Sequence, residues 1–327
     1  MSALTYEVDP QFQALVTDRL DVIEARLLDA ARADVDFVTE AATHIIAAGG
    51  KRFRPLLVVL ASQLLPGADA DRIDRAAVVM ELTHVASLYH DDVMDEAEVR
   101  RSVDSANARW DNTLAILVGD FLFSRASSTV ATLGTEYVAL QAQTFARLVQ
   151  GQIAETRGPL PDGDPLQHYL DVVADKTGSL IAASARFGGM VCGASDEVLD
   201  ALGRFGEEIG VVFQLSADIF DIASDTSGKT PGTDLREGVL TLPTLMVAAS
   251  TDPADARLRD LVSRPLTDEA EVTEAIGRLR AHPLLDAARR EIERRADVAR
   301  SYLAPLPSGS AKDALATLCD QVVSRST

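Results

Sequence analysis

The stretch "LYHDDVMDEAEVRRS", residues 88–102, carries three aspartates at a spacing that suits metal binding. On a helix that advances about 100° per residue, Asp91 and Asp95 lie about 40° apart, one turn above the other, with Asp92 beside them. Such oxygen ligands suit Mg²⁺, which keeps several waters and shares its other positions with phosphate oxygens. A solvated helix end would also explain the acids alone, but this cluster follows an apolar run, where solvated charge is not expected.

A second set of carboxylates occurs in "FQLSADIFDIASD". Asp218, Asp221 and Asp225 recur at three- and four-residue spacing, so they share one face of a helix that is otherwise rich in Val, Phe, Leu and Ile. Buried carboxylates are costly unless they are paired or bind metal. Two such helices facing each other across a bundle would form a deep site for several metal ions.

Cationic side chains occur at two places that suit phosphate binding. Arg100 and Arg101 follow the first aspartates within about a turn and a half, and guanidinium groups match phosphate geometry. In "GGKRFRP", Lys51, Arg52 and Arg54 lie between a glycine pair and a proline expected to begin a helix, which is typical of an anion-binding turn. Basic loops without a specific ligand are also common, so this second signal is weak by itself.

The rest of the chain predicts an all-α fold. Of 327 residues, 47% are hydrophobic and only 5% aromatic, and apolar residues recur at three- and four-residue spacing. We expect long helices over residues 12–31, 54–65, 75–97, 112–133, 136–156 and 197–225, with Ser195 and Thr267 as N-caps. No linker is long enough to separate two domains. Two of these helices are apolar nearly all round, which indicates a bundle centre or a subunit interface.

Charge and cysteine content exclude several classes of protein. A net charge of −19 disfavours binding to nucleic acid or anionic membranes. The chain begins without a signal-like segment, and no run reaches about 18 uninterrupted apolar residues, so we expect a cytoplasmic protein without stable membrane insertion. Cys192 and Cys319 are isolated in apolar segments, which disfavours a disulfide framework or a thiolate metal site.

Taken in order, these motifs resemble one family, the trans-isoprenyl diphosphate synthases, also called polyprenyl synthetases. The resemblance extends from "GGKRFRP" through "ELTHVASLYHDDVMDEAEVRRS", "VGDFLFS", "DKTGSL" and "GVVFQLSADIFD" to "SGKTPGTDLREGVLTLP". It implies a single domain over residues 1–327, built of long antiparallel helices around a deep central cavity and usually found as a homodimer. It also implies head-to-tail condensation of isopentenyl diphosphate with an allylic diphosphate, dependent on two or three Mg²⁺ ions per active site.

The resemblance also implies a role for individual residues. Loss of diphosphate from the allylic substrate leaves a delocalised carbocation, so catalysis consists mainly of stabilising the leaving group. The catalytic residues are Asp91, Asp92, Asp95, Lys176 and Asp218. The Mg²⁺ ligands are Asp91, Asp95, Asp218 and Asp221. The allylic diphosphate is bound by Arg100, Lys176, Thr177, Gln214 and Lys229. Isopentenyl diphosphate is bound by Lys51, Arg54, His84 and Arg101.

Two departures from the family pattern stand out. The second motif normally begins with two aspartates, but here the first position is Ala217, and the missing carboxylate would normally hold a third Mg²⁺. Its loss would weaken that metal, shift the load to Asp218 and Asp221, or mark a subunit with impaired catalysis. Gln152 and Glu155 occupy places where the family usually has Glu and Gln, and we interpret them as a swapped polar pair.

Product length is predicted from small residues upstream of the first aspartate. In the family, a bulky residue one turn before that aspartate blocks the growing chain, and here these places hold Ala86 and Ser87. By resemblance the product should exceed fifteen carbons, with Met80 and Phe121 as candidates for the cavity floor. The alternative is that Ala86 and Ser87 are simply packing residues on a crowded helix.

Three other functions are alternatives to this prediction. "SGKT" suggests a nucleotide-binding loop, but Ala223 replaces the required glycine and no strand pattern precedes it. Terpene cyclases of the same fold would not need a second diphosphate site. The strongest alternative is a catalytically impaired structural or regulatory subunit of a heteromeric prenyl synthase, to which Ala217 would point, although retention of the other motif residues argues against it.

Overall fold

The computed structural model describes residues 9–223 and 231–324 and is built almost wholly of helices. Its residues group into two compact units, each made of three chain segments. Unit 1 contains residues 1–146, 180–203 and 305–317, and unit 2 contains residues 147–179, 204–304 and 318–327. The division cuts through α7 (Thr135–Arg157), α10 (Asp196–Ala223) and α16 (Ser310–Val323), and it separates the first residue of α9 (Ser179–Val191) from the rest. The single domain over residues 1–327 therefore stays a prediction.

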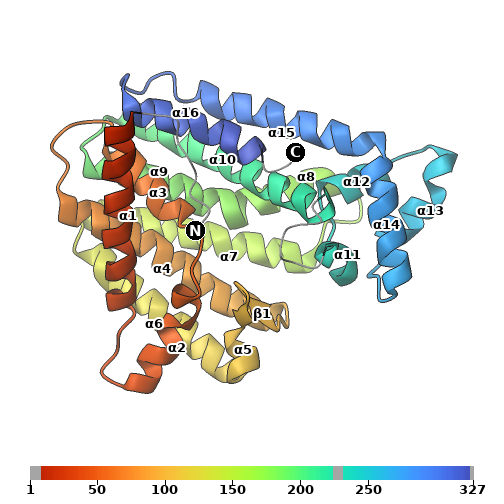
Figure 1. Cartoon of the computed structure of the whole chain (residues 1–327), viewed down its shortest axis with the longest axis horizontal. Coiled ribbons are helices and arrows are strands. Elements are labelled where there is room, and N and C mark those ends of the chain that lie inside the picture. Colours follow the sequence, from red (N-terminus) through yellow and green to blue (C-terminus); the bar gives the residue numbers. More distant parts are fainter. Residues whose placement is uncertain (1–8, 224–230, 325–327) are drawn as a thin grey trace. The chain divides into compact units, whose positions relative to one another are not determined.

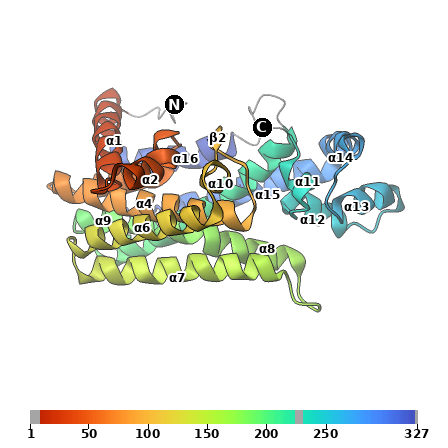
Figure 2. The same cartoon turned by 90° about the horizontal axis from the view of Figure 1, so that it is seen from below.

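Unit 1 is built around two long neighbouring helices, α4 and α6, which lie side by side in both views (Figures 1 and 2). Its elements are α1 (Pro10–Ala30), α2 (Asp36–Ala47), α3 (Phe53–Ser62), α4 (Ala70–Met94), β1 (Val99–Arg100), β2 (Val103–Asp104), α5 (Ala106–Arg109), α6 (Asn112–Ala131) and, apart from its first residue, α9 (Ser179–Val191). The two strands pair antiparallel in a short hairpin after α4, which the sequence did not predict.

Close packing of α4 against α6 depends on Gly119. A Cβ atom at this position would lie 2.3 Å from Nε2 of His90 and 3.2 Å from the carbonyl oxygen of Ala86, both on α4. Any larger residue would force the two helices apart. The glycine of "VGDFLFS" therefore brings α6 close to the part of α4 that leads into the first aspartates.

A buried ion pair fastens the N-terminal helix to α4. Asp74 of α4 is almost fully buried, and its carboxylate lies 3.2 Å from Nη1 of Arg19 and 3.2 Å from Nε of Arg26, both on α1. Burial of a carboxylate is tolerated here because two guanidinium groups compensate it.

The two helices that looked apolar all round differ in burial. Every residue of α3 from Pro55 to its end is buried, as expected of a bundle centre. By contrast, Ile116 and Leu117 of α6 are 44% and 58% exposed. Among the described residues, α6 is the one helix long and apolar enough to cross a membrane, with a mean hydropathy of 1.3. Its packing along α4 is typical of a helix within a folded unit, and the predicted lack of membrane insertion stays a prediction.

Unit 2 places short helices beside one long one. Its elements are α8 (Pro165–Val173), the π-helical turn η1 (Ala174–Gly178), α11 (Thr233–Glu237), α12 (Leu242–Ala248), the 3₁₀ turn η2 (Pro253–Asp255), α13 (Ala256–Val262), α14 (Glu269–Ala281) and α15 (Pro283–Ser301). A core that includes Val247, Leu261 and Leu279 joins α12, α13 and α14.

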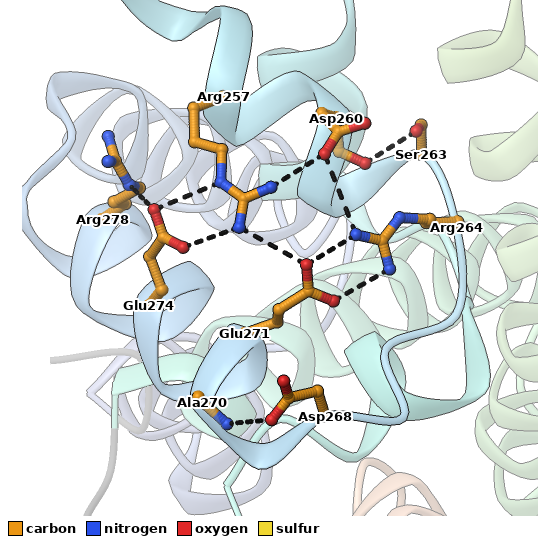
Figure 3. A network of polar contacts seen from close by, with 9 residues as sticks. All are labelled: Arg257, Asp260, Ser263, Arg264, Asp268, Ala270, Glu271, Glu274 and Arg278. Carbon is orange, nitrogen blue, oxygen red and sulfur yellow. Dashed lines mark hydrogen bonds and ion pairs between the residues drawn. The ribbon is translucent and has the colours of Figure 1, made fainter.

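An ion-pair network holds the outer faces of α13 and α14 together (Figure 3). Arg257 reaches Glu274 at 2.9 Å and Glu271 at 3.4 Å, and Arg264 reaches Glu271 at 2.8 Å. The two arginines are exposed and the two glutamates half-buried, so each pair contributes little by itself, and shared partners make the network more stabilising than separate pairs.

The predicted helices agree well with the observed ones, and one of the two predicted caps is correct. Ser195 accepts a hydrogen bond from the backbone N–H of Val198 at the start of α10. The prediction for Thr267 is wrong by one residue, because the side chain of Asp268 caps α14 by accepting from Ala270. Both residue types have the required oxygen, so composition alone did not select between them.

Candidate active site

The first aspartate motif lies at the end of α4, and its three carboxylates have different environments. Asp95 is the exposed C-cap, and its backbone N–H donates to the carbonyl of Asp91 at 2.8 Å, which confirms the predicted one-turn spacing. Asp91 is partly buried, whereas Asp92 is fully buried. Asp92 is therefore separated from the two residues predicted to bind Mg²⁺.

Asp92 is paired with an arginine that the sequence predicted for substrate binding. Its Oδ1 atom accepts from Nε of Arg100 at 2.6 Å and lies 2.5 Å from Nη2. Burial raises the pKa of Asp92, and Arg100 opposes that shift. Within the described part of the chain, no donor reaches its Oδ2 atom. The structure thus assigns Asp92 a contact with a cation rather than an exposed ligand position.

The helix predicted over residues 75–97 ends three residues earlier, and Arg100 and Arg101 belong to the hairpin that follows it. α4 ends at Met94, and Arg100 lies in β1 of the hairpin. Arg101 and Ser102 form its turn with positive φ angles of 53° and 65°. Left-handed backbone is rare for residues with a side chain, so this turn is a strained feature of the kind often found at functional sites.

A second group of cations gathers at the start of α3, next to α4. Arg52 is the N-cap of α3 with φ of 48°, so the helix begins before Pro55 and not at it. Its guanidinium lies 2.6 Å from Glu24 of α1 and 3.0 Å from Glu81 of α4. Arg101 donates to the carbonyl of Ile45 at 2.9 Å and lies 3.7 Å from Glu81. Unit 1 therefore brings together two motifs that lie about 50 residues apart in the sequence.

Gly50 makes room for two guanidinium groups. A Cβ atom at Gly50 would lie 2.9 Å from Nη1 of Arg52 and 3.0 Å from Cζ of Arg101. Gly50 therefore lets both guanidinium groups lie close to the backbone, whereas Gly49 supplies the positive φ of 90° that the turn uses.

The cations perturb one another and their neighbours. Burial lowers the pKa of Arg54 to about 10, a shift that Glu81 opposes and Arg101 increases. Among the described residues, no partner accepts from its buried Nε atom. Burial, followed by the charges of Arg54 and Arg101, lowers the pKa of His84 well below its usual value. His84 is therefore a neutral imidazole at neutral pH, and Lys51 is exposed at the edge of this group.

The second motif lies on α10 in unit 2 and has neutral partners. Asp218 is buried, its Oδ2 atom accepts from the hydroxyl of Tyr169, and its Oδ1 atom accepts from Nε2 of Gln214 at 3.0 Å. Burial raises the pKa of Asp218 to about 6. Asp221 is partly buried, and Ala217 is exposed. Asp225 and Lys229 lie outside the described residues.

The π-helical turn carries the two predicted residues of "DKTGSL", Lys176 and Thr177. Nζ of Lys176 lies 2.6 Å from Oε2 of Glu155 on α7. Arg147 of α7 reaches Asp175 and Glu207, each at 2.7 Å, and so ties this turn to α10. A π turn inside a helical segment often marks a functional site. The family usually has Gln at the position of Glu155. Here Glu155 supplies a carboxylate at this position, and it forms an ion pair with Lys176.

The predicted chain-length residues are both buried in unit 1. Ala86 is fully buried and Ser87 nearly so, and the hydroxyl of Ser87 donates to the carbonyl of His84 at 2.8 Å. Met80 is fully buried, whereas Phe121 is partly exposed. The control of product length by Ala86 and Ser87 stays a prediction.

Carboxylates in the described residues do not form a ready-made metal cage. No group of three or more His, Cys, Asp or Glu side chains converges there. Asp91 and Asp95 nevertheless supply two hard oxygen donors one turn apart, which fits an ion that keeps waters and takes phosphate oxygens. The residues present are therefore compatible with Mg²⁺. The prediction that the motifs of α4 and α10 face one another stays a prediction.

The sequence did not predict three partners of the site residues: the carboxylates of Glu81 and Glu24, which pair with Arg52, and the hydroxyl of Tyr169, which donates to Asp218. Glu81 had a detectable signal, because it is a charged residue inside the apolar run "VVMELTHV". Glu24 is one of many acids on α1 and gave no such signal. Tyr169 gave none either, because its partner Asp218 is 49 residues away.

Comparison with known proteins identifies the family of the chain. Residues 35–279 match the polyprenyl synthetase family. The chain is 48% identical to a nonaprenyl diphosphate synthase of Mycobacterium tuberculosis, covering 97% of this chain and 95% of the relative. A dimethylallyltranstransferase of the same organism is 40% identical, with 97% of each chain covered.

Solved structures give the same result. The chain resembles the crystal structure of geranylgeranyl pyrophosphate synthase from Corynebacterium glutamicum complexed with calcium and isoprenyl diphosphate, with a TM-score of 0.87, 44% identity and coverage of 98% and 99% of the two chains. For polyprenyl synthase from Caulobacter crescentus, the TM-score is 0.88 at 32% identity, with 99% and 100% covered. The predicted all-α fold of the isoprenoid synthase type is thus confirmed, and the chain belongs to the polyprenyl synthetase family.

Proposed function

We propose that this protein is a Mg²⁺-dependent prenyltransferase that condenses isopentenyl diphosphate with an allylic diphosphate to make all-trans polyprenyl diphosphates longer than fifteen carbons. The observation that carries the proposal lies within unit 1. A chain of net charge −19 gathers Arg52, Arg54 and Arg101 around a neutral His84, next to the exposed end of α4 that carries Asp91 and Asp95. Cations for one diphosphate and carboxylates for a metal ion therefore belong to one small region.

The reaction breaks the allylic carbon–oxygen bond, and diphosphate leaves with the electron pair. The double bond of isopentenyl diphosphate then forms the new carbon–carbon bond, and loss of a proton from that unit restores a double bond in the product. Arg54 and Arg101 bind the diphosphate that is retained, and His84 contributes hydrogen bonds without adding charge. We propose Arg100 for the diphosphate that leaves, and the family resemblance assigns Lys176, Thr177, Gln214 and Lys229 to the same diphosphate. No covalent enzyme intermediate is needed.

Bound Mg²⁺ would neutralise the charge that develops on the leaving diphosphate. Asp91 and Asp95 would hold it through carboxylate oxygens, and we propose Asp218 and Asp221 as further ligands. Support comes from the solved relatives that were complexed with calcium and isoprenyl diphosphate. Asp92 is not among these ligands, because it is fully buried and its Oδ1 atom is paired with Arg100.

The direct test uses radiolabelled isopentenyl diphosphate with farnesyl or geranylgeranyl diphosphate and Mg²⁺. We expect longer diphosphates, separated by chain length, and no elongation in the presence of EDTA. Failure to elongate any allylic primer would contradict the proposal and would favour a non-catalytic subunit of a heteromeric synthase.

Product length tests the role of small residues in α4. Ser87→Phe should shift the products towards fifteen carbons, because a bulky ring would fill the space that the growing chain needs. Ser87→Ala is the matched control and should leave the product distribution unchanged. An unchanged distribution in a folded Ser87→Phe enzyme would make Ser87 a packing residue only.

We further propose a cytoplasmic homodimer that forms through α6. Ile116 and Leu117 of α6 and Val138 of α7 are 39% to 58% exposed, and burial of such residues against a second copy would be favourable. Leu117→Glu should convert the dimer to a monomer in light scattering, whereas Ser128→Glu, on an exposed polar part of α6, should not. A wild-type monomer would contradict this part of the proposal.

A further inference from the structure

Two arginines that are neighbours in the sequence pair with two different buried carboxylates of α4. Arg100 binds Asp92, with Nε and Nη2 at 2.6 and 2.5 Å from Oδ1. Arg101 donates from Nη1 to the carbonyl of Ile45 at 2.9 Å, and its Nη2 lies 3.7 Å from Oε1 of Glu81. Glu81 is 2% exposed, and Asp92 is fully buried. Nothing in the sequence motif itself separates the two arginines.

We propose that Asp92 and Glu81 are positioning residues that assign Arg100 to the allylic diphosphate and Arg101 to isopentenyl diphosphate. This inference rests on the proposed function, since it concerns the two substrates of that reaction. Neither carboxylate would contact a substrate, and each would act through the arginine that it holds.

The backbone of the hairpin allows the two arginines to diverge. Arg100 is in a strand, where successive side chains point to opposite faces, and Arg101 follows with left-handed φ of 53°. Glu81 and Asp92 are eleven residues apart on α4, which places them about 20° apart around the helix and about 16 Å apart along it. One face of one helix therefore offers two separate anchor points.

Burial makes both anchors persistent. Asp92 without Arg100 would be left as an uncompensated buried charge, so this pair should stay formed with or without substrate. Glu81 is buried close to both Arg52 and Arg101, and its carboxylate stays compensated while it holds Arg101 in place. Glu81 also contacts Arg52 at 3.0 Å, and the three arginines at positions 52, 54 and 101 outnumber it. The group around Glu81 therefore remains cationic and can still bind a diphosphate.

The test is a crossed pattern of Michaelis constants. Glu81→Gln should raise the KM for isopentenyl diphosphate about tenfold, as is usual when a residue behind a binding group is lost, with the KM for the allylic substrate nearly unchanged. Asp92→Asn should raise the KM for the allylic substrate by a similar factor and leave that for isopentenyl diphosphate nearly unchanged. A general loss of stability would not raise the KM for one substrate in the first variant and the KM for the other substrate in the second.

Asp74→Asn is the matched control, because Asp74 is also a buried carboxylate of α4 that pairs with arginines, but its partners Arg19 and Arg26 are on α1. It should lower the melting temperature and leave both KM values unchanged. Glu81→Asp and Asp92→Glu keep the charge and should show the same crossed pattern in weaker form, which preserves the test if a neutral variant fails to fold.

Two outcomes are distinguishable. If the wild type is active and each variant changes both KM values together, or neither, then Asp92 and Glu81 do not assign the two arginines to different substrates. The proposed reaction would not be affected by this result. A wild type that elongates no primer would contradict the proposed reaction, and with it the assignment of the two arginines to two substrates.

Discussion

The two aspartate motifs differ in how their buried carboxylate is compensated. On α4, Asp92 is paired with Arg100, and the motif leaves Asp91 and Asp95 at the end of the helix. On α10, Asp218 is held by a tyrosine and a glutamine, both neutral donors. The motif of α4 is thus balanced by the protein itself, whereas the described partners of Asp218 supply no opposite charge.

This difference suggests that the two motifs respond differently to a bound cation. A carboxylate that is buried with an arginine keeps its charge and its position without metal. A carboxylate that is buried with neutral donors pays a desolvation cost, which is why the pKa of Asp218 is raised to about 6. We infer that the α4 motif is largely organised before Mg²⁺ binds and that the α10 motif gains most from it.

The largest expected effect comes from removing a carboxylate of α4 that is proposed to hold Mg²⁺. Asp91→Asn should lower kcat by about 10² to 10³, the usual cost of losing one electrostatic stabiliser of a transition state. Steady-state kinetics at saturating substrates and Mg²⁺ measure it, and Glu136→Gln, an exposed acid at the start of α7, is the control. An Asp91→Asn enzyme that remains as active as this control would show that α4 is not the principal cation site.

The next effect concerns the stability of the metal-free protein. Asp218 has a folded pKa of about 6 and an unfolded value near 3.8, so the folded state binds the extra proton between these values. The free energy of unfolding of the wild type, compared with that of Asp218→Asn, should therefore fall by up to about 3 kcal/mol as the pH rises from 4 to 6. Above pH 6 it should stay at this lower value.

Urea unfolding in EDTA at pH 4.5 and 7.5 measures this difference. Asp162→Asn, which replaces an exposed acid of the same unit, controls for general effects of removing a charge. Equal pH dependence in the wild type and in Asp218→Asn would mean that Asp218 is compensated after all, and the contrast between the motifs would disappear.

How far sequence predicts such a site is clear from α4. Its helix follows from apolar residues at helical spacing, which is local information, and the one-turn relation of Asp91 and Asp95 follows directly. The hairpin after it could not be predicted, because strands of two residues show no alternation. The opposite directions of Arg100 and Arg101 depend on the strained turn at Arg101 and on buried partners that only the folded chain brings near.

The α10 motif shows a different limit. The helix and the replacement at Ala217 were evident from the sequence, but the partners of Asp218 were not. Gln214 is one turn away and detectable in principle, whereas Tyr169 comes from another helix. Local periodicity finds residues on one helix and fails for partners that tertiary packing supplies.

A smaller effect is expected from His84 of α4, whose imidazole is neutral in the folded protein. Because the pKa of His84 is lowered, the unfolded chain binds a proton below about pH 6.5 that the folded protein does not. Stability should therefore fall as pH drops from 6.5, by about 1.4 kcal/mol per pH unit, and His84→Gln should lack this contribution. Denaturant unfolding at pH 7.5 and 5.5 measures it, with His168→Gln as control. A wild type and a His84→Gln variant with equal pH dependence would contradict a neutral His84.

The smallest effect restores the missing carboxylate of the second motif. Ala217 is exposed and lies one turn before Asp221, so an aspartate there fits without disturbing the core and would add a second oxygen donor on that side of α10. If a third Mg²⁺ limits the reaction, Ala217→Asp should raise kcat a few-fold, about 1 kcal/mol in barrier height, and lower the Mg²⁺ concentration for half-maximal rate. Ala217→Asn, with nearly the same shape and no charge, should do neither. An unchanged or lower rate in Ala217→Asp would show that Asp218 and Asp221 suffice, so that α10 needs fewer carboxylates than the family pattern implies.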